Sequence, residues 1–287
     1  MRRRDRRVLL GVIGGAFGVV GGLLLLGLRS APARPRPDPG GIPADAPSQG
    51  PLAHVWVVLD PGHGGEDPGT TAGPLSEAAL TYRLATEVTA ALRASGASVV
   101  YTVRSRSLDP ALAVIEPPLE RPTDATLVTT GRPLRERHSA APLWQRAALA
   151  RTVWERQASR DPNVRRDVFF LSLHFDQFGA PGVAGGEVCV DRRAPHVPSL
   201  APLLAASLAQ GGFGRGTEYR GVRGLSVHEL GVLNPAHNPI PESVLVELAT
   251  LSNPQDALNA ADPTWRSGMA RRIADAIISV HQGKGSP

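Results

Sequence analysis

The sequence has 287 residues and 42% hydrophobic content, which favours one folded domain with appendages over two full domains. Its formal charge of +5 is concentrated at the start: residues 2–7 contribute +4, whereas 23 basic and 23 acidic side chains cancel from Pro51 onward. A near-neutral body lacks the basic surface of a nucleic-acid-binding protein, so no nucleic-acid partner is predicted. Cys189 is the only cysteine, which excludes an intrachain disulfide and a multi-cysteine metal site.

The N-terminal part of the chain predicts a membrane anchor. Residues 8–28 carry no charge and, as a helix, would span about 31 Å, enough to cross a bilayer. This stretch is longer than the apolar region of about 7–15 residues in a cleavable signal peptide, so residues 1–29 are interpreted as an uncleaved transmembrane anchor. The preceding arginines favour the cytoplasmic side, which places the rest of the chain in the periplasm or another extracytoplasmic space. Residues 30–53 are proline-rich and predict an extended linker.

The first half of the predicted domain, which spans residues 54–283, begins with a buried strand. This β-favouring run, VWVVL, stops at Asp60, and His63 stands in the glycine-rich turn that follows. Apolar spacing predicts a helix over 76–95, with Ser76 as its N-cap and Glu77 in its first turn. A strand over 97–103 and an irregular, proline-containing insertion at about 105–141 come next. A helix over 142–160 is expected to bury Leu143, Ala147, Ala150 and Trp154.

The second half repeats the pattern of the opening strand. The run 167–173 ends in His174, and the run 243–248 has Glu247 at its end. Further strands are predicted over 185–190 and 221–230, and helices over 198–210 and 262–282. Continuous apolar runs are typical of parallel strands that are buried on both faces, so we expect His63, His174 and Glu247 to meet at one edge of a sheet.

These residue types together predict a catalytic zinc site. Two imidazoles, His63 and His174, and the carboxylate of Glu77 supply three ligands and leave a fourth position for water. Zinc would lower the pKa of that water to about 7, and the site then needs a base to accept the proton. Glu247 is the candidate for this base.

Four motifs resemble a known family. LDPGHGGEDPG at 59–69, SEAAL at 76–80, FLSLHFD at 170–176 and SVLVELATLSNPQDA at 243–257 resemble the zinc-dependent N-acetylmuramoyl-L-alanine amidases of amidase type 3. The resemblance implies that His63, Glu77 and His174 bind Zn²⁺ and that Glu247 is the catalytic base. The implied reaction hydrolyses the amide between N-acetylmuramic acid and L-alanine in peptidoglycan, for cell-wall remodelling or daughter-cell separation. The implied fold is a three-layer α/β domain, with a mostly parallel sheet of about six strands and helices on both faces.

The sequence also departs from the family pattern. Phe175 and Asp176 follow the second histidine where the family usually has a small residue and then Asn, and Ala249-Thr250 replaces the usual Gly-Phe. Two alternatives therefore stay open: a noncatalytic peptidoglycan-binding module and a zinc peptidase that cuts within the stem peptide. In relatives, elements such as the insertion can cover the cleft, so an activator protein that relieves autoinhibition is a further hypothesis.

Overall fold

A computed structural model describes residues 49–65, 67–105, 126–128, 141–161, 167–177, 182–210, 218–219 and 222–283. The predicted membrane helix at 8–28, most of the linker and most of the insertion lie outside these residues. Among the helices that are described, none combines the length and apolarity needed to cross a membrane. The elements, in chain order, are β1 (Trp56–Pro61), β2 (Thr71–Ala72), β3 (Leu75–Ser76), α1 (Glu77–Ala94), β4 (Ser98–Tyr101), β5 (Val103–Ser105), β6 (Thr126–Val128), α2 (Ala141–Ala158), β7 (Val168–Asp176), β8 (Glu187–Asp191), α3 (Leu200–Gln210), β9 (Glu218–Tyr219), β10 (Val222–Arg223), β11 (Leu225–His228), the 3₁₀ helix η3 (Gly231–Leu233), β12 (Glu242–Thr250), α4 (Pro254–Ala261) and α5 (Pro263–His281).

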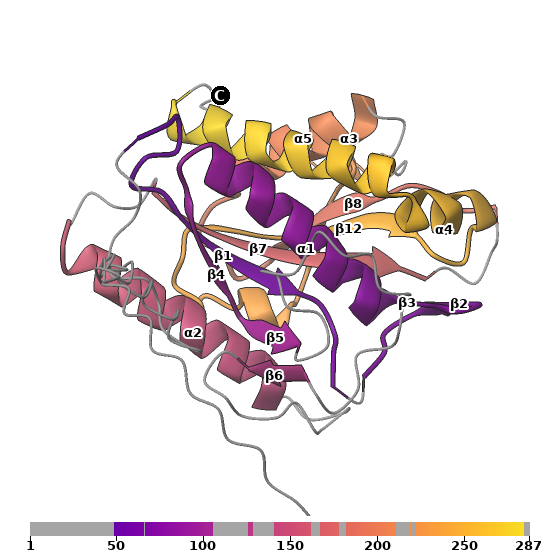
Figure 1. The fold of residues 1–287 in the computed structure, drawn as a ribbon. Helices are drawn as coiled ribbons and strands as arrows, with labels where there is room; N and C mark the ends of the chain where they lie inside the picture. Colours follow the sequence, from indigo (N-terminus) through magenta and orange to yellow (C-terminus); the bar gives the residue numbers. More distant parts are fainter. Residues whose placement is uncertain are drawn as a thin grey trace, which may run out of the picture. The chain divides into compact units, whose positions relative to one another are not determined.

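A six-stranded sheet forms the centre of the domain (Figure 1). The strand order is β11-β8-β12-β7-β1-β4. Strands β4, β1, β7 and β12 are parallel to one another, whereas β8 is antiparallel to β12 and parallel to β11. The prediction of a mostly parallel sheet of about six strands is confirmed.

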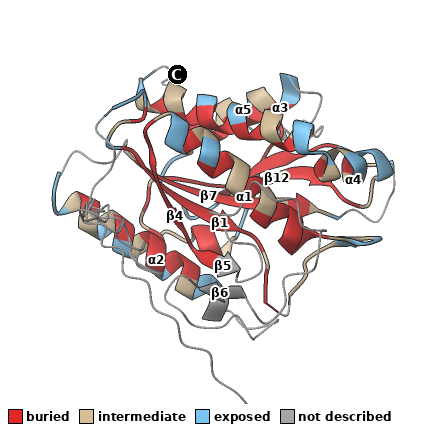
Figure 2. Cartoon of the chain, viewed as in Figure 1, coloured by how far each residue is buried: buried red, intermediate tan, exposed pale blue. Residues whose placement is uncertain are grey.

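Helices cover both faces of this sheet, as predicted. Helices α1, α3 and α5 pack on one face, and α2 lies on the other (Figure 1). The core is correspondingly divided into two hydrophobic clusters, and the central strands are buried along their length (Figure 2). In α1 the apolar residues at every fourth position are fully buried, as the spacing predicts: Leu80, Leu84, Val88 and Leu92.

Several predicted elements differ in extent. The strand expected over 97–103 ends at Tyr101, and β5 leaves the main sheet to pair with β6 of the insertion. The strand expected over 221–230 is divided into β10 and β11. Helix α4 was not predicted, although its cap is visible in the sequence: Asn253 accepts hydrogen bonds from two backbone N–H groups, and Pro254 follows it.

Helix α2 buries part of the predicted face. Ala147 and Ala150 are fully buried and Trp154 packs against the core, as predicted, whereas Leu143 is 41% exposed. The buried side also includes Leu149, Val153 and Arg146, and Arg146 is only 4% exposed. A charged side chain therefore faces the sheet, which hydropathy alone argues against.

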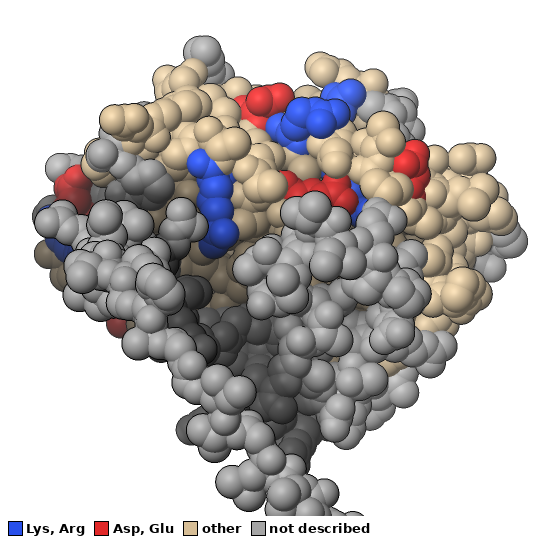
Figure 3. Space-filling view, in the orientation of Figure 1, with Lys and Arg blue, Asp and Glu red and all other residues tan. Residues whose placement is uncertain are grey.

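The charged side chains show no concentration of one sign on the face drawn in Figure 3. Where the structure describes this face, Lys and Arg lie among Asp and Glu, with uncharged residues between them (Figure 3). This mixture agrees with the balanced charge of the sequence after Pro51.

Candidate metal centre

The strand register brings the predicted site residues to one edge of the sheet. Pro61, the last residue of β1, lies opposite Leu173 of β7, so that His63 follows β1 at the level where His174 emerges. In the neighbouring pair, Glu247 of β12 lies opposite His174. Neither His174 nor Glu247 ends its strand as predicted, because β7 continues to Asp176 and β12 to Thr250. The three residues nevertheless line one pocket.

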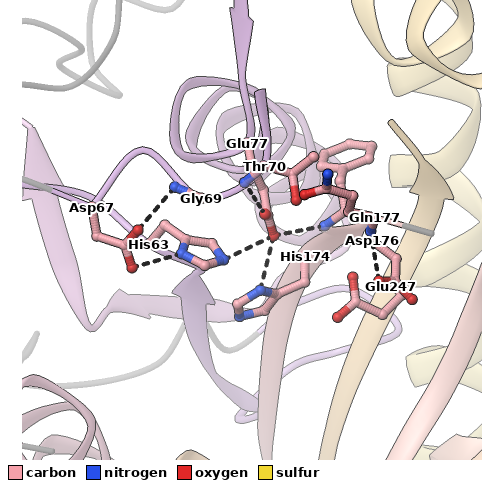
Figure 4. Close-up of a pocket in the computed structure, with 10 residues that line it drawn as sticks. His63, Asp67, Gly69, Thr70, Glu77, His174, Asp176, Gln177 and Glu247 are labelled. Atoms are coloured by element: carbon pink, nitrogen blue, oxygen red, sulfur yellow. Dashed lines mark hydrogen bonds and ion pairs between the residues drawn. The ribbon is translucent and has the colours of Figure 1, made fainter. Parts of the chain in front are cut away.

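His63 is held in an unfavourable backbone conformation. Its φ of 61° is in the left-handed region, which costs a non-glycine residue about 1–3 kcal/mol unless the surroundings impose it. Its Nδ1 lies 2.9 Å from Asp67 Oδ2, and its Nε2 lies 3.1 Å from Glu77 Oε1 (Figure 4). Burial lowers the pKa of His63, but the hydrogen bonds to Asp67 and Glu77 outweigh it and raise the pKa to about 10. The two neighbouring carboxylates therefore favour the protonated form of His63.

Glu77 is the centre of the arrangement. It is the first residue of α1 and only 2% exposed. Its Oε1 lies 3.0 Å from His174 Nδ1 and accepts a hydrogen bond from the Phe175 N–H, while its Oε2 accepts one from the Thr70 N–H (Figure 4). Burial alone would raise the pKa of Glu77, but the hydrogen bonds from His174 and His63 hold it well below its ordinary value. Glu77 is thus a carboxylate fixed between two imidazoles.

Ser76 occupies the predicted N-cap position without capping the helix through its side chain. Its Oγ is buried and makes no hydrogen bond. The N–H of Glu77 instead donates to the backbone oxygen of Thr70, and that of Ala78 donates to Pro68. The start of α1 is therefore fixed by the loop that carries Asp67, Gly69 and Thr70.

Two glycines allow the ligands to approach the backbone. A Cβ at Gly62 would lie 2.4–2.7 Å from the His174 ring. A Cβ at Gly69, whose φ is 64°, would lie 2.6 Å from Glu77 Oε2 and 2.7 Å from the His63 ring. The glycines in the motif after β1 therefore leave space for the three predicted ligands as well as turning the chain.

The three side chains fit a divalent cation. One ligand atom from each of His63, Glu77 and His174 lies within 4.8 Å of the other two. Ligand atoms about 2.0–2.2 Å from a tetrahedral zinc are about 3.3–3.6 Å apart, close to the observed separations of 3.0 and 3.1 Å from Glu77 Oε1. The pocket above them has a volume of about 450 Å³ and is also lined by Glu247, Asp176 and Gln177. A metal held here would have room for water and substrate on its open side.

Three supporting residues were not predicted from the sequence. Asp67 bonds the imidazole nitrogen of His63 that faces away from Glu77, the usual arrangement behind a metal-binding histidine. Arg146 and Asp60 form a buried ion pair of 2.7 Å beneath the loop that carries His63. Asp67 could have been found from its place four residues after His63, whereas Arg146 lies 83 residues away.

The family departures do not disturb the three predicted ligands. Phe175 is 1% exposed and packs in the core, while its backbone N–H still donates to Glu77. Thr250 donates a hydrogen bond from Oγ1 to the Gly185 backbone oxygen, and Asp256 accepts from the N–H groups of both residues. Asp176 lines the pocket and accepts a hydrogen bond from the Gln177 N–H. The unusual residues thus support the fold or border the pocket.

A second group of metal-binding residue types lies on β8 and β11. Ligand atoms of Glu187, Cys189 and His228 are within 4.8 Å of one another. However, Cys189 Sγ and His228 Nε2 both lie at hydrogen-bond distance from Ser226 Oγ, at 3.3 and 3.1 Å. Burial raises the pKa of Cys189 to about 12, so its thiol stays protonated. Cys189 is a buried residue of β8, the strand that was predicted over 185–190.

Comparisons with known proteins identify relatives along most of the chain. The sequence is 24% identical, over 83% of its length and 84% of the relative's, to a germination-specific N-acetylmuramoyl-L-alanine amidase of Bacillus subtilis. The fold is similar to the amidase Ami1 of Mycobacterium smegmatis, with a TM-score of 0.55, 21% identity and coverage of 81% of this chain and 99% of that one. It is also similar to the amidase CwlD of Clostridioides difficile, solved in complex with the lipoprotein GerS, with a TM-score of 0.50, 19% identity and coverage of 80% and 98%.

The family assignment rests on the sequence itself. Residues 57–279 match the family model Amidase_3, described as N-acetylmuramoyl-L-alanine amidase. This range contains every predicted site residue and nearly all of β1 and α5. The chain therefore belongs to the amidase type 3 family of N-acetylmuramoyl-L-alanine amidases.

Proposed function

We propose that the protein is a zinc-dependent amidase that hydrolyses the bond between the lactyl group of N-acetylmuramic acid and L-alanine in peptidoglycan. The observation that carries the proposal is the convergence of His63, Glu77 and His174 at the floor of an open pocket that Glu247 also lines. Family membership supports the reaction, and the donor set supports the metal.

His63, Glu77 and His174 would hold the zinc ion. When bound, zinc supplies Lewis acidity that polarises the scissile carbonyl and lowers the pKa of a neighbouring water to about 7. Asp67 keeps a proton on Nδ1 of His63 and so directs Nε2 toward the site. The Phe175 and Thr70 N–H groups orient the two oxygens of Glu77. Every proposed ligand is therefore oriented by a second contact or by a strand.

Glu247 is the proposed base. It lies beside His174 on the neighbouring strand and borders the pocket (Figure 4). Its carboxylate accepts the proton of the attacking water as the oxygen adds to the amide carbon. The same carboxyl group then donates that proton to the departing nitrogen of L-alanine, which leaves an amine on the peptide and a carboxyl group on the lactyl ether.

The cellular setting follows from the substrate and the N-terminal sequence. Peptidoglycan lies outside the cytoplasm, so residues 54–283 would act there while residues 1–29 anchor the chain in the membrane and residues 30–53 form the linker. The relative CwlD was solved with a lipoprotein partner, which supports an activator protein as a partner of this chain too. Such a partner would relieve autoinhibition by the insertion at about 105–141.

Metal analysis combined with digestion of purified sacculi tests this function. We expect one zinc ion per chain and the release of intact stem peptides with new L-alanine amines, leaving glycan strands free of peptide. Absence of both zinc and hydrolysis would instead indicate a wall-binding module. Mass spectrometry separates the remaining alternative, because a stem-peptide peptidase leaves L-alanine attached to the glycan.

A further inference from the structure

The loop after β1 has its carbonyl groups held by side chains from two helices. Arg146 of α2 donates to the Pro61 oxygen at 2.7 Å and to the His63 oxygen at 2.6 Å. Thr81 of α1 donates to the Gly62 oxygen at 2.9 Å. The carbonyl groups of three consecutive residues, from Pro61 to His63, are therefore held by side chains from outside the loop.

The charge of Arg146 is balanced at the same point. Its Nη1 lies 2.7 Å from Asp60 Oδ1, and both side chains are almost completely buried, at 5% and 2% exposure. Asp60 also accepts hydrogen bonds from the hydroxyl groups of Thr102 and Ser172. Asp60 and Ser172 are register partners on β1 and β7, so the pair is tied to the two strands that deliver His63 and His174.

This ion pair contributes to the shape of the loop more than to the stability of the fold. A buried pair gains little over apolar packing, because both charges lose their hydration. What the guanidinium adds here is its planar shape, which reaches a carboxylate and two carbonyl oxygens at once. His63 is the residue that requires such restraint, since its φ of 61° directs the imidazole toward Glu77.

We propose that Arg146, paired with Asp60, is a positioning residue that holds His63 in its metal-binding conformation. The inference rests on the proposed function, because it takes His63 as a metal ligand. Without the guanidinium, the His63 peptide can relax from the left-handed region, and the imidazole then leaves the position where its Nε2 meets Glu77. Arg146 touches neither the metal position nor the substrate, and its effect passes through the loop.

Arg266 of α5 provides a matched control. It is 3% exposed, pairs with Glu87 at 2.9 Å, and donates to the backbone oxygens of Ala260 and Ala261. Glu87 lies ten residues after Glu77 on α1, about 15 Å along the helix. Replacing Arg266 thus removes an equally buried guanidinium, its ion pair with the 21% exposed Glu87 and two carbonyl contacts, without reaching the metal-site loop.

The test compares Arg146→Met, Arg146→Lys and Arg266→Met in the full-length chain, purified in detergent because of its apolar N-terminal stretch. Zinc affinity is measured by competition with a chromophoric chelator, and thermal unfolding of the metal-free proteins reports folding. We expect both methionine variants to unfold at lower temperature, but only the Arg146 variants to bind zinc about 10–100-fold more weakly, the usual effect of losing a residue behind a metal ligand. Arg146→Lys should restore affinity only in part, because an ammonium cannot span three acceptors.

Two outcomes would overturn the inference. One is wild-type zinc affinity in Arg146→Met, and the other is an equal loss of affinity in Arg266→Met. If Arg146→Met does not fold, Arg146→Lys and Ser172→Ala are tested in its place, because Ser172→Ala removes one hydrogen bond to Asp60. Wild-type zinc affinity in both of these variants would then overturn the inference. A separate control, His63→Ala, distinguishes failure of the proposed metal site from failure of the positioning role. If His63→Ala binds zinc as tightly as the wild type does, the proposed metal site is wrong. If His63→Ala loses zinc affinity but Arg146→Met does not, only the positioning role is refuted.

Discussion

Gly62→Ala tests the packing of the metal centre with a single methyl group. The added Cβ would lie 2.4 Å from the His174 ring, whereas carbon atoms at van der Waals contact are about 3.5 Å apart. The ring must therefore move by about 1 Å, since β1 and β7 are fixed by their ladder. Gly62 does not have the positive φ of its neighbours Gly64 and Gly65, so the substitution adds a clash without backbone strain.

The expected magnitude follows from the tolerance of metal coordination. Metal–ligand distances are fixed to about 0.2 Å, so a displacement of about 1 Å removes His174 from effective coordination. We expect zinc affinity to fall at least tenfold and amide hydrolysis to fall about 100-fold. Release of stem peptides from sacculi and chelator competition measure the two effects. Gly268→Ala in α5 is the control, because a Cβ there meets no atom within 4 Å.

A clear result would contradict this reasoning. If Gly62→Ala bound zinc within a factor of about three of the wild type and kept its rate, the close approach between the loop and His174 would not constrain the site. An equal loss of both properties in Gly268→Ala would show that the effect is general.

Three further predictions concern the chemistry of the site. Glu247→Gln should retain zinc but lose at least 100-fold in hydrolysis, measured as new L-alanine amines; full activity would exclude Glu247 as the base. The raised pKa of His63, about 10 against an ordinary 6.5, stabilises the metal-free protein fully below pH 6.5, and this stabilisation disappears as the pH rises toward 10. Urea unfolding of the zinc-free protein should therefore give a lower midpoint at pH 9.5 than at pH 6.5, while zinc affinity rises over the same range because binding releases the proton. Asp67→Asn should flatten both pH dependences, and unchanged profiles would refute the assignment of Asp67 as the proton partner.

The sequence predicted the sheet and the donor set because both depend on local patterns. Continuous apolar runs identified β1, β7 and β12, and the polar residue at or near the end of each run pointed to one edge of the sheet. Glu77 was found from its place in the first turn of an amphipathic helix. The lengths of β7 and β12 were underestimated, because His174 and Glu247 interrupt the apolar runs although both strands continue past them, to Asp176 and Thr250.

The supporting residues required information that a local pattern does not contain. In α2, the periodicity of apolar side chains predicted a buried stripe of Leu143, Ala147, Ala150 and Trp154, and it assigned no role to Arg146. The two alanines are buried as predicted, whereas Leu143 is 41% exposed. Arg146 is 4% exposed, and its guanidinium donates to the carboxylate of Asp60 and to two loop carbonyls. The burial of Arg146 thus depends on a partner 86 residues away in the sequence. A helix that buries a charged side chain beside its apolar stripe is a place where the fold has been adapted to hold a site.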